Sequence, residues 1–423
     1  MSAGSDFPRT QVPSSATYSG RHIALVIVGG TIAIPAFLMA ATMGASLGLR
    51  DAVIAFTCGC FVLGSLAALT GLCGQKSGLS AYVLSEFAFG RWGGKVANLA
   101  VACSLLGWYG VTGTMFGRAG AQLGASVFGV DWPIELYVIA GSSLMVGVTL
   151  SGFKGIDKLA LALVPVMVIF LGVAAGISYG AVEDWTVPTG GQTMSLYTAV
   201  SAVIGSYIAG VTIQPDYSRF ARSRKAATWS AFLALGISFP FTLSLAAVPA
   251  VAMGEPDILN VMILIGIGIP AFALLVLAAW SSNVLSLYSG SLAMATIFRG
   301  TGLPAIITAF GIVGTALALT RVDEYLVAYL LLLGITIPPI SSIYAVETLL
   351  FRTRFDETAR GERPLVVYRS MLAWLLAIFA GYMAQEGIFS LTNVAALDSI
   401  LVAAVLAVAL RPLDALRLRT LLR

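Results

Sequence analysis

The chain has 423 residues, of which 58% are hydrophobic and only 10% are charged, and its mean hydropathy is +0.92. An ordinary soluble domain carries about a quarter charged residues, so the composition excludes a soluble protein and leaves no length for an appended soluble enzyme. The chain has a single histidine, His22, which excludes a histidine-based metal site or catalytic triad. The net charge is +4, and what it means depends on where the basic residues lie.

The first residues are polar and rich in Ser and Pro, and we expect a disordered cytoplasmic tail over 1–20. Twelve apolar runs follow, each long enough to cross a bilayer as a helix of about 20 residues. Strands of an outer-membrane barrel would instead alternate apolar and polar residues over about ten positions. The runs lie near residues 22–48, 52–72, 93–121, 134–152, 157–180, 195–213, 227–252, 258–292, 303–320, 324–347, 367–384 and 389–410.

Of the 24 Lys and Arg residues, only Arg50, Arg118 and Arg321 fall in, or at the edges of, loops that follow an odd-numbered run. The others lie in the two tails and in, or at the edges of, the loops after even-numbered runs. Because cytoplasmic loops are enriched in Lys and Arg, this alternation predicts that both termini are cytoplasmic. It also accounts for the positive net charge, so we expect no nucleic-acid partner.

Two runs in equivalent places carry helix-weakening sequences at membrane depth, namely 29–35 (GGTIAIP) in run one and 205–210 (GSYIAG) in run six. These breaks are 175 residues apart, counted from Gly30 to Gly205. Trp108 of run three and Trp280 of run eight are 172 residues apart. Both offsets fit a repeat of five helices, which must be inverted because five is odd. The alternative is that Gly and Pro are simply common in membrane helices.

The sequence therefore predicts an all-α integral membrane protein with twelve transmembrane helices. We expect a first five-helix repeat over 21–180 and a second, inverted one over 195–350. Two additional C-terminal helices over 364–411 and a basic cytoplasmic tail over 412–423 complete the chain.

Broken helices mark a binding site, because unpaired backbone groups persist in a bilayer only where they line a cavity or bind a ligand. Run eight carries the polar patch Ser281, Ser282 and Asn283 in a long apolar segment. The serine hydroxyls, with carbonyls freed in the first break, suit a weakly bound monovalent cation, since no carboxylate is present. The alternative is that both serines bond back to carbonyls of their own helix.

Trp108 lies deep within run three and is flanked by glycines, so its ring suits a planar heterocycle. Packing or an interfacial position is the alternative for such a residue. Ser206, Tyr207 and Asn283 are candidates for the few hydrogen bonds that orient a ligand in a mostly apolar pocket.

Few charged side chains lie within the runs, and charge inside a membrane normally marks a proton relay or a charged substrate. Glu347 lies near the cytoplasmic end of run ten, and Asp398 lies in run twelve, outside the repeats. Both positions favour a structural role. The substrate is therefore expected to be uncharged.

Short motifs are spread over nearly the whole chain: Val12–Pro13, Gly107–Trp108, Met115–Phe116, Gly205–Ser206, 216–220 (DYSRF), 280–288 and 337–339 (IPP). With these motifs, the sequence resembles the nucleobase:cation symporters, and within them the cytosine permease branch, over about residues 10–412. The resemblance implies the leucine-transporter-type fold, with five plus five helices in an inverted repeat and two more at the C-terminus.

The resemblance also implies the binding residues. The base would stack on Trp108 and Tyr207, with hydrogen bonds from Ser206 and Asn283. A co-transported sodium ion would be bound by backbone carbonyls and serine hydroxyls, namely the carbonyls of Thr31, Ile34 and Ala278 and the hydroxyls of Ser281 and Ser282.

Some positions depart from the cytosine permease pattern: Leu105 replaces a Gln, Ala209 replaces a Ser, and Val284–Leu285 replaces Asp-Asn. Losing such groups costs a hydrogen-bonded ligand about 1–3 kcal/mol. The resemblance implies cytosine or a related pyrimidine or purine as the substrate. Because of these losses, a hydroxymethylpyrimidine or allantoin-type permease is the alternative. Proton coupling or no coupling is the alternative to sodium.

The sequence thus predicts a monomeric plasma-membrane symporter that imports a small planar nucleobase-like heterocycle by alternating access. A channel or uncoupled facilitator is a second class, but the inverted repeat favours a transporter and no filter-like sequence is visible. A membrane enzyme is a third class, and the motifs H-E-x-x-H and G-x-S-x-G in a suitable context are lacking. We therefore expect no enzymatic activity and no cofactor.

Overall fold

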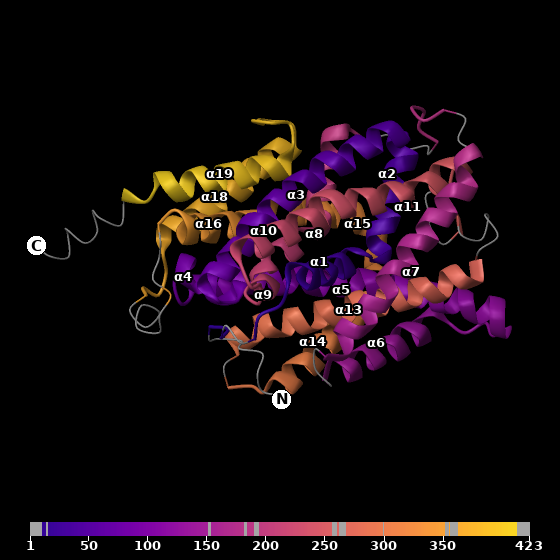
Figure 1. The fold of residues 1–423 in the computed structure, drawn as a ribbon, viewed down its shortest axis with the longest axis horizontal. Helices are drawn as coiled ribbons and strands as arrows, with labels where there is room; N and C mark the ends of the chain where they lie inside the picture. Colours follow the sequence, from indigo (N-terminus) through magenta and orange to yellow (C-terminus); the bar gives the residue numbers. More distant parts are fainter. Residues whose placement is uncertain are drawn as a thin grey trace, which may run out of the picture.

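The computed structural model shows a bundle of helices that run lengthwise past one another (Figure 1). Among the described residues, the only β-type pairing is an isolated parallel bridge between Tyr18 and Ala221. The described residues are 11–13, 16–150, 154–181, 184–189, 194–255, 260–261, 268–298, 300–351, 355 and 363–412.

The helices follow the predicted apolar runs. The first half contains α1 (Gly20–Thr31), α2 (Ile34–Leu47), α3 (Leu49–Ser77), α4 (Ala81–Phe89), α5 (Gly93–Leu123), the π-helical turn η2 (Gly124–Phe128), α6 (Ile134–Leu150), α7 (Lys154–Ser178) and the 3₁₀ turn η3 (Tyr179–Ala181). The second half contains α8 (Leu196–Thr212), α9 (Gln214–Ser218), α10 (Arg224–Phe232), the π-helical segment η4 (Leu233–Ser238), α11 (Phe239–Met253), α13 (Gly268–Ile297), α14 (Leu303–Ala318), the 3₁₀ turn η5 (Val322–Tyr325), α15 (Leu326–Thr336) and α16 (Pro338–Leu349). The C-terminal pair is α18 (Tyr368–Gln385) and α19 (Ala395–Ala409).

Four helical segments of the described chain are long and apolar enough to cross a membrane, and a fifth results if the bent pair α1 and α2 is one span. The four segments are Leu49–Ser77, Gly93–Leu123, Arg224–Met253 and Val322–Leu349. Shorter apolar helices, among them α6, α8, α14 and α19, lie within other predicted runs. The all-helical membrane architecture is confirmed, whereas the number of twelve spans and the inverted repeat stay predictions.

The first helix break lies where the sequence predicts it. α1 ends at Thr31, α2 begins at Ile34, and the two helices are bent by 63°. Pro35 lies in the first turn of α2, where a missing N–H removes no helical hydrogen bond. The proline therefore starts the second half of the span.

The second break lies at Ile213, so the predicted position within 205–210 is wrong. α8 continues through both glycines of that stretch before α9 begins. Gly205 serves close packing instead, since a Cβ there would overlap the carbonyl oxygen of Leu330 in α15. The helix ends where Pro215 lacks the N–H that would continue the hydrogen-bond ladder.

The N-terminal arm is ordered over part of the range 1–20, for which we expected disorder. The Val12 N–H donates to the Gly78 carbonyl at 3.2 Å, and the Tyr18 N–H donates to the Phe220 carbonyl at 2.7 Å. The expectation of disorder is therefore wrong for the described part of the arm, which packs beside the C-terminal end of α3.

The central helices pack closely through small residues. α5 packs along α13 and α14, and α3 packs along α8 and α10. Gly59 of α3 faces Val203, and Gly74 of α3 faces Pro215. Small residues at such contacts allow membrane helices to approach one another closely. The C-terminal helices α18 and α19 pack on each other and on α16 along one side of the bundle (Figure 1).

Candidate substrate and ion site

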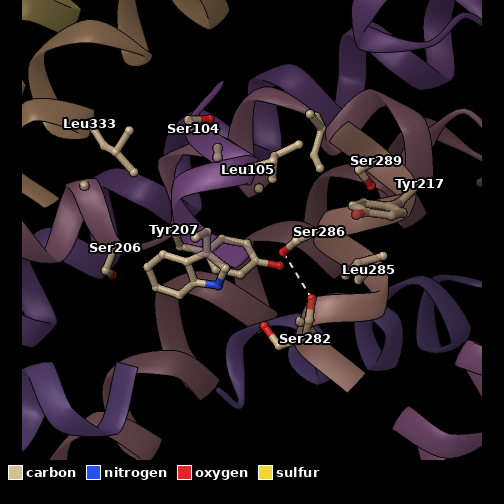
Figure 2. A pocket seen from close by; sticks show the side chains of 16 residues that line it. Ser104, Leu105, Ser206, Tyr207, Tyr217, Ser282, Leu285, Ser286, Ser289 and Leu333 are labelled. Atoms are coloured by element: carbon tan, nitrogen blue, oxygen red, sulfur yellow. Dashed lines mark hydrogen bonds between the residues drawn. The ribbon is translucent and has the colours of Figure 1, made fainter. Parts of the chain in front are cut away.

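A cavity lies beside the first helix break, between residues of α1, α5, α8 and α13. About 50 Å³ of its interior is open to the centre of a water-sized molecule. None of its described lining residues carries a charge. They are Gly30, Ser104, Leu105, Trp108, Gly205, Ser206, Tyr207, Ala209, Gly210, Ile213, Tyr217, Ser282, Leu285, Ser286, Ser289 and Leu333 (Figure 2).

Both aromatic residues predicted to stack on the substrate line this cavity. Trp108 comes from α5 and Tyr207 from α8. The Tyr207 hydroxyl donates to the Ile27 carbonyl of α1 at 3.4 Å. A Cβ on Gly30 would lie only 2.6 Å from this hydroxyl, so the glycine makes room for the tyrosine beside the break. The aromatic faces suit a planar ligand.

Three serine side chains form a stripe along α13. Ser282, Ser286 and Ser289 are four and three residues apart, a spacing that places them on one helix face, and all three line the cavity (Figure 2). The Ser286 hydroxyl donates to the Ser282 carbonyl at 3.1 Å. Across the cavity, the Ser206 hydroxyl donates to the Val203 carbonyl at 2.7 Å, so its oxygen can still accept a hydrogen bond.

Asn283 does not line the cavity, although the sequence analysis placed it among the binding residues. It follows Ser282 directly and so points about 100° away around the helix. The side chain is 0% exposed. Its Nδ2 donates to the Tyr109 carbonyl at 3.3 Å and lies 3.5 Å from the Met145 sulfur. In this arrangement the amide joins α13 to α5 and α6 behind the cavity.

The predicted sodium ligands come from the first break and from α13, and α13 contacts both halves of the break. Thr31 is the last residue of α1 and Ile34 the first of α2. The Thr31 carbonyl accepts one backbone N–H at 3.1 Å, which leaves it a second lone pair. Ala278 is buried and Ser282 lines the cavity, whereas the side chain of Ser281 lies outside the described part. The full ligand set stays a prediction.

Several lining residues of the cavity were not predicted from the sequence. Ser286 and Ser289 have a local signal, because they continue the helical face that begins at Ser282. Tyr217 and Leu333 have none, since α9 and α15 reach the cavity only through tertiary packing.

Three positions where polar residues are lost, Leu105, Ala209 and Leu285, line the cavity. They make three parts of the lining apolar. Hydrogen bonding to a ligand is therefore concentrated on the serine stripe, Ser104, Ser206, Trp108 and the two tyrosines.

The two acidic residues considered for an intramembrane role have structural partners. Glu347 pairs with Arg369 and Arg411, each at an N–O distance of 2.6 Å. Asp398 accepts four hydrogen bonds of 2.6–3.0 Å from residues 390–392. Neither residue lines the cavity, in agreement with the structural role predicted for both.

An all-helical membrane bundle with a broken helix beside an uncharged cavity defines a transporter of small molecules. The model of the family described as permease for cytosine/purines, uracil, thiamine, allantoin matches residues 11–397. The chain belongs to this family. It is thus a multi-pass membrane transport protein for nucleobase-like compounds and not an enzyme.

Known proteins support this assignment. The chain is 28% identical over 385 residues to the cytosine permeases of Escherichia coli K12 and O157:H7, which covers 90% of each chain. Among solved structures it is similar to inward-facing Mhp1 (TM-score 0.78, 17% identity, covering 96% of this chain and 95% of the other). It is also similar to a Na⁺-coupled sialic acid symporter (TM-score 0.70, 14% identity, covering 94% and 90%). These likenesses show the predicted leucine-transporter-type fold.

Proposed function

We propose that the protein imports an uncharged, planar nucleobase-like heterocycle across the plasma membrane together with a sodium ion, by alternating access. The observation that carries this proposal is the cavity itself. It combines the aromatic rings of Trp108, Tyr207 and Tyr217 with a stripe of hydroxyls, contains no charged lining residue among those described, and adjoins a break in a membrane helix.

The lining chemistry supports a nucleobase-like ligand. A flat ring can stack on Trp108 or Tyr207, and each hydroxyl can donate to a ring nitrogen or accept from an exocyclic amine. A charged ligand would be left without a counter-charge at membrane depth. Cytosine or a related pyrimidine or purine is the proposed substrate, and the apolar positions Leu105 and Ala209 keep hydroxymethylpyrimidine and allantoin as the alternatives.

The placement of Ser282 supports sodium as the coupling ion. Its side chain lines the cavity on the helix that packs against the break, and neutral oxygen ligands suit a weakly bound monovalent cation. The relative described as Na⁺-coupled shares the fold. A proton, or no coupling ion, is the alternative.

The proposed topology places both termini in the cytoplasm and follows from the alternation of basic loops. We also propose that the protein acts as a monomer, since residues of a single chain line the cavity.

The experiment is uptake of radiolabelled cytosine into cells that lack their own nucleobase carriers, at constant ionic strength with sodium or choline. Uracil, adenine, hypoxanthine, allantoin and hydroxymethylpyrimidine serve as unlabelled competitors. We expect sodium-dependent accumulation above the external concentration. Equilibration without accumulation would favour the facilitator, and failure of every base as substrate in a well-expressed protein would refute the proposal.

A further inference from the structure

The C-terminal helices α18 and α19 lie outside both predicted repeats, and none of their residues is among those that line the cavity. They pack against α15 and α16, which are two halves of one apolar segment interrupted at Ile337, directly before the prolines at 338–339. Leu333, a lining residue of the cavity, lies in α15 one turn before this interruption. The interruption therefore lies one helical turn from the lining of the cavity.

The interruption removes backbone donors. The prolines at 338–339 have no N–H, so the carbonyls four residues earlier, including that of Gly334, lose their helical partners. The Ile340 N–H bonds to the Ile337 carbonyl at 3.1 Å, and the Thr336 carbonyl is thereby left without its helical partner as well. Such carbonyls at membrane depth need a donor from elsewhere in the protein.

The C-terminal helices supply these donors. The indole Nε1–H of Trp374 in α18 donates to the Thr336 carbonyl at 2.9 Å. The Ser399 hydroxyl in α19 lies 3.3 Å from the Gly334 carbonyl, but it is also 2.9 Å from the Ala396 carbonyl of its own helix. Because a hydroxyl has one proton to donate, Trp374 provides the dedicated hydrogen bond.

Further contacts fix the same helices on either side of the interruption. Glu347, near the C-terminal end of α16, pairs with Arg369 of α18 and with Arg411 beyond α19. The Ala396 N–H of α19 donates to the Ser201 hydroxyl of α8 at 3.4 Å, and α8 itself lines the cavity. The C-terminal pair therefore connects the interruption to a helix of the cavity.

We propose that Trp374 is a positioning residue for the cavity, because its indole N–H fixes the interruption between α15 and α16 and thereby the place of Leu333 in the lining. On this basis α18 and α19 belong to the transport machinery, although they lie outside the repeats. The uptake part of the test rests on the proposed transport function, and a second measurement does not depend on it.

The test variant is Trp374→Phe, which keeps an aromatic ring and removes the donor. Hydrogen exchange of the purified protein should show at least fivefold faster exchange of the amides of residues 337 and 340–342, with no change within α3. Uptake of radiolabelled cytosine should show a threefold or larger rise in KM, with Vmax per surface molecule within twofold of the wild type. Ser399→Ala should give a smaller effect of the same kind.

The matched control is Trp229→Phe, the same chemical change at a tryptophan that is 57% exposed on α10, and it should alter neither measurement. Unchanged exchange at 337–342 in Trp374→Phe would overturn the proposal. A lower amount of protein at the surface with unchanged KM would also overturn it, since that result indicates a purely structural residue. If the wild type takes up no base of the panel, the proposed function fails, and the exchange measurement alone decides on Trp374.

Discussion

Replacing Gly30 by alanine tests whether the space left by this glycine places the Tyr207 ring in the cavity. A Cβ at residue 30 would lie 2.6 Å from the Tyr207 hydroxyl oxygen, whereas ordinary contacts begin at 3.4 Å. The hydroxyl must therefore move by about 0.8 Å or more. The ring has little room to do so, because it packs against Gly210 and lies 5.9 Å from the Phe239 ring.

Overpacking of this kind costs about 1–3 kcal/mol, which corresponds to roughly 5- to 140-fold in affinity if the whole penalty falls on substrate binding. Gly30→Ala should accordingly raise the KM for uptake by a factor in this range. The geometry also predicts a rescue. In Gly30→Ala/Tyr207→Phe the clashing oxygen is gone, and the nearest remaining atom of that ring, Cζ, would lie at an unstrained 3.7 Å.

The assay is concentration-dependent uptake in the two single variants and the double variant, corrected for surface expression. Gly147→Ala is the matched control, since a Cβ there meets nothing within 4 Å. A double variant no better than Gly30→Ala would refute the reasoning, because the penalty could not then come from the contact with the hydroxyl.

Three further predictions concern the ion, the substrate and the stability of the fold. Ser282→Ala should raise the sodium concentration for half-maximal uptake without reordering the competitors, and an unchanged sodium dependence would remove this serine from the ion site. Leu105→Gln should raise the affinity for cytosine relative to the other bases, measured by competition, by roughly 5- to 140-fold, the equivalent of one hydrogen bond of about 1–3 kcal/mol. An unchanged ranking of the competitors would contradict this prediction. Glu347→Gln should lower the thermal stability of the purified protein, since it removes the negative charge that pairs with the buried guanidinium of Arg369, at a cost of about 3–5 kcal/mol, and an unaltered unfolding temperature would show that the pair is dispensable.

Much of the fold could be predicted because apolar length and loop charge follow directly from the properties of a bilayer. The first break was placed correctly because 29–35 contains Pro35, which lies in the first turn of α2 and whose missing N–H acts locally. The second break was misplaced because Gly205 and Gly210 serve close contacts with α15 and with the Tyr207 ring. A glycine that permits packing and a glycine that weakens a helix look the same in one sequence.

The site was predicted in part for a similar reason. Trp108 and Tyr207 were identified from their chemistry, but the polar patch of run eight was assigned without its helical phase, so Asn283 was included and Ser286 and Ser289 were left out. The donors that satisfy the broken helices had no local signal. Tyr344, for example, donates to the Thr212 carbonyl at 2.7 Å from a position 132 residues away.

The uncharged lining of the cavity has an electrical consequence. With one sodium ion beside a neutral substrate, the loaded carrier would bear a single positive charge, while the empty carrier would return with none. At about 100 mV, negative inside, the membrane potential then contributes about 2.3 kcal/mol per cycle, enough for roughly 40-fold accumulation before any sodium gradient is added. Uptake should generate an inward current of one elementary charge per substrate molecule, and the voltage-dependent part of the cycle should be the loaded step alone.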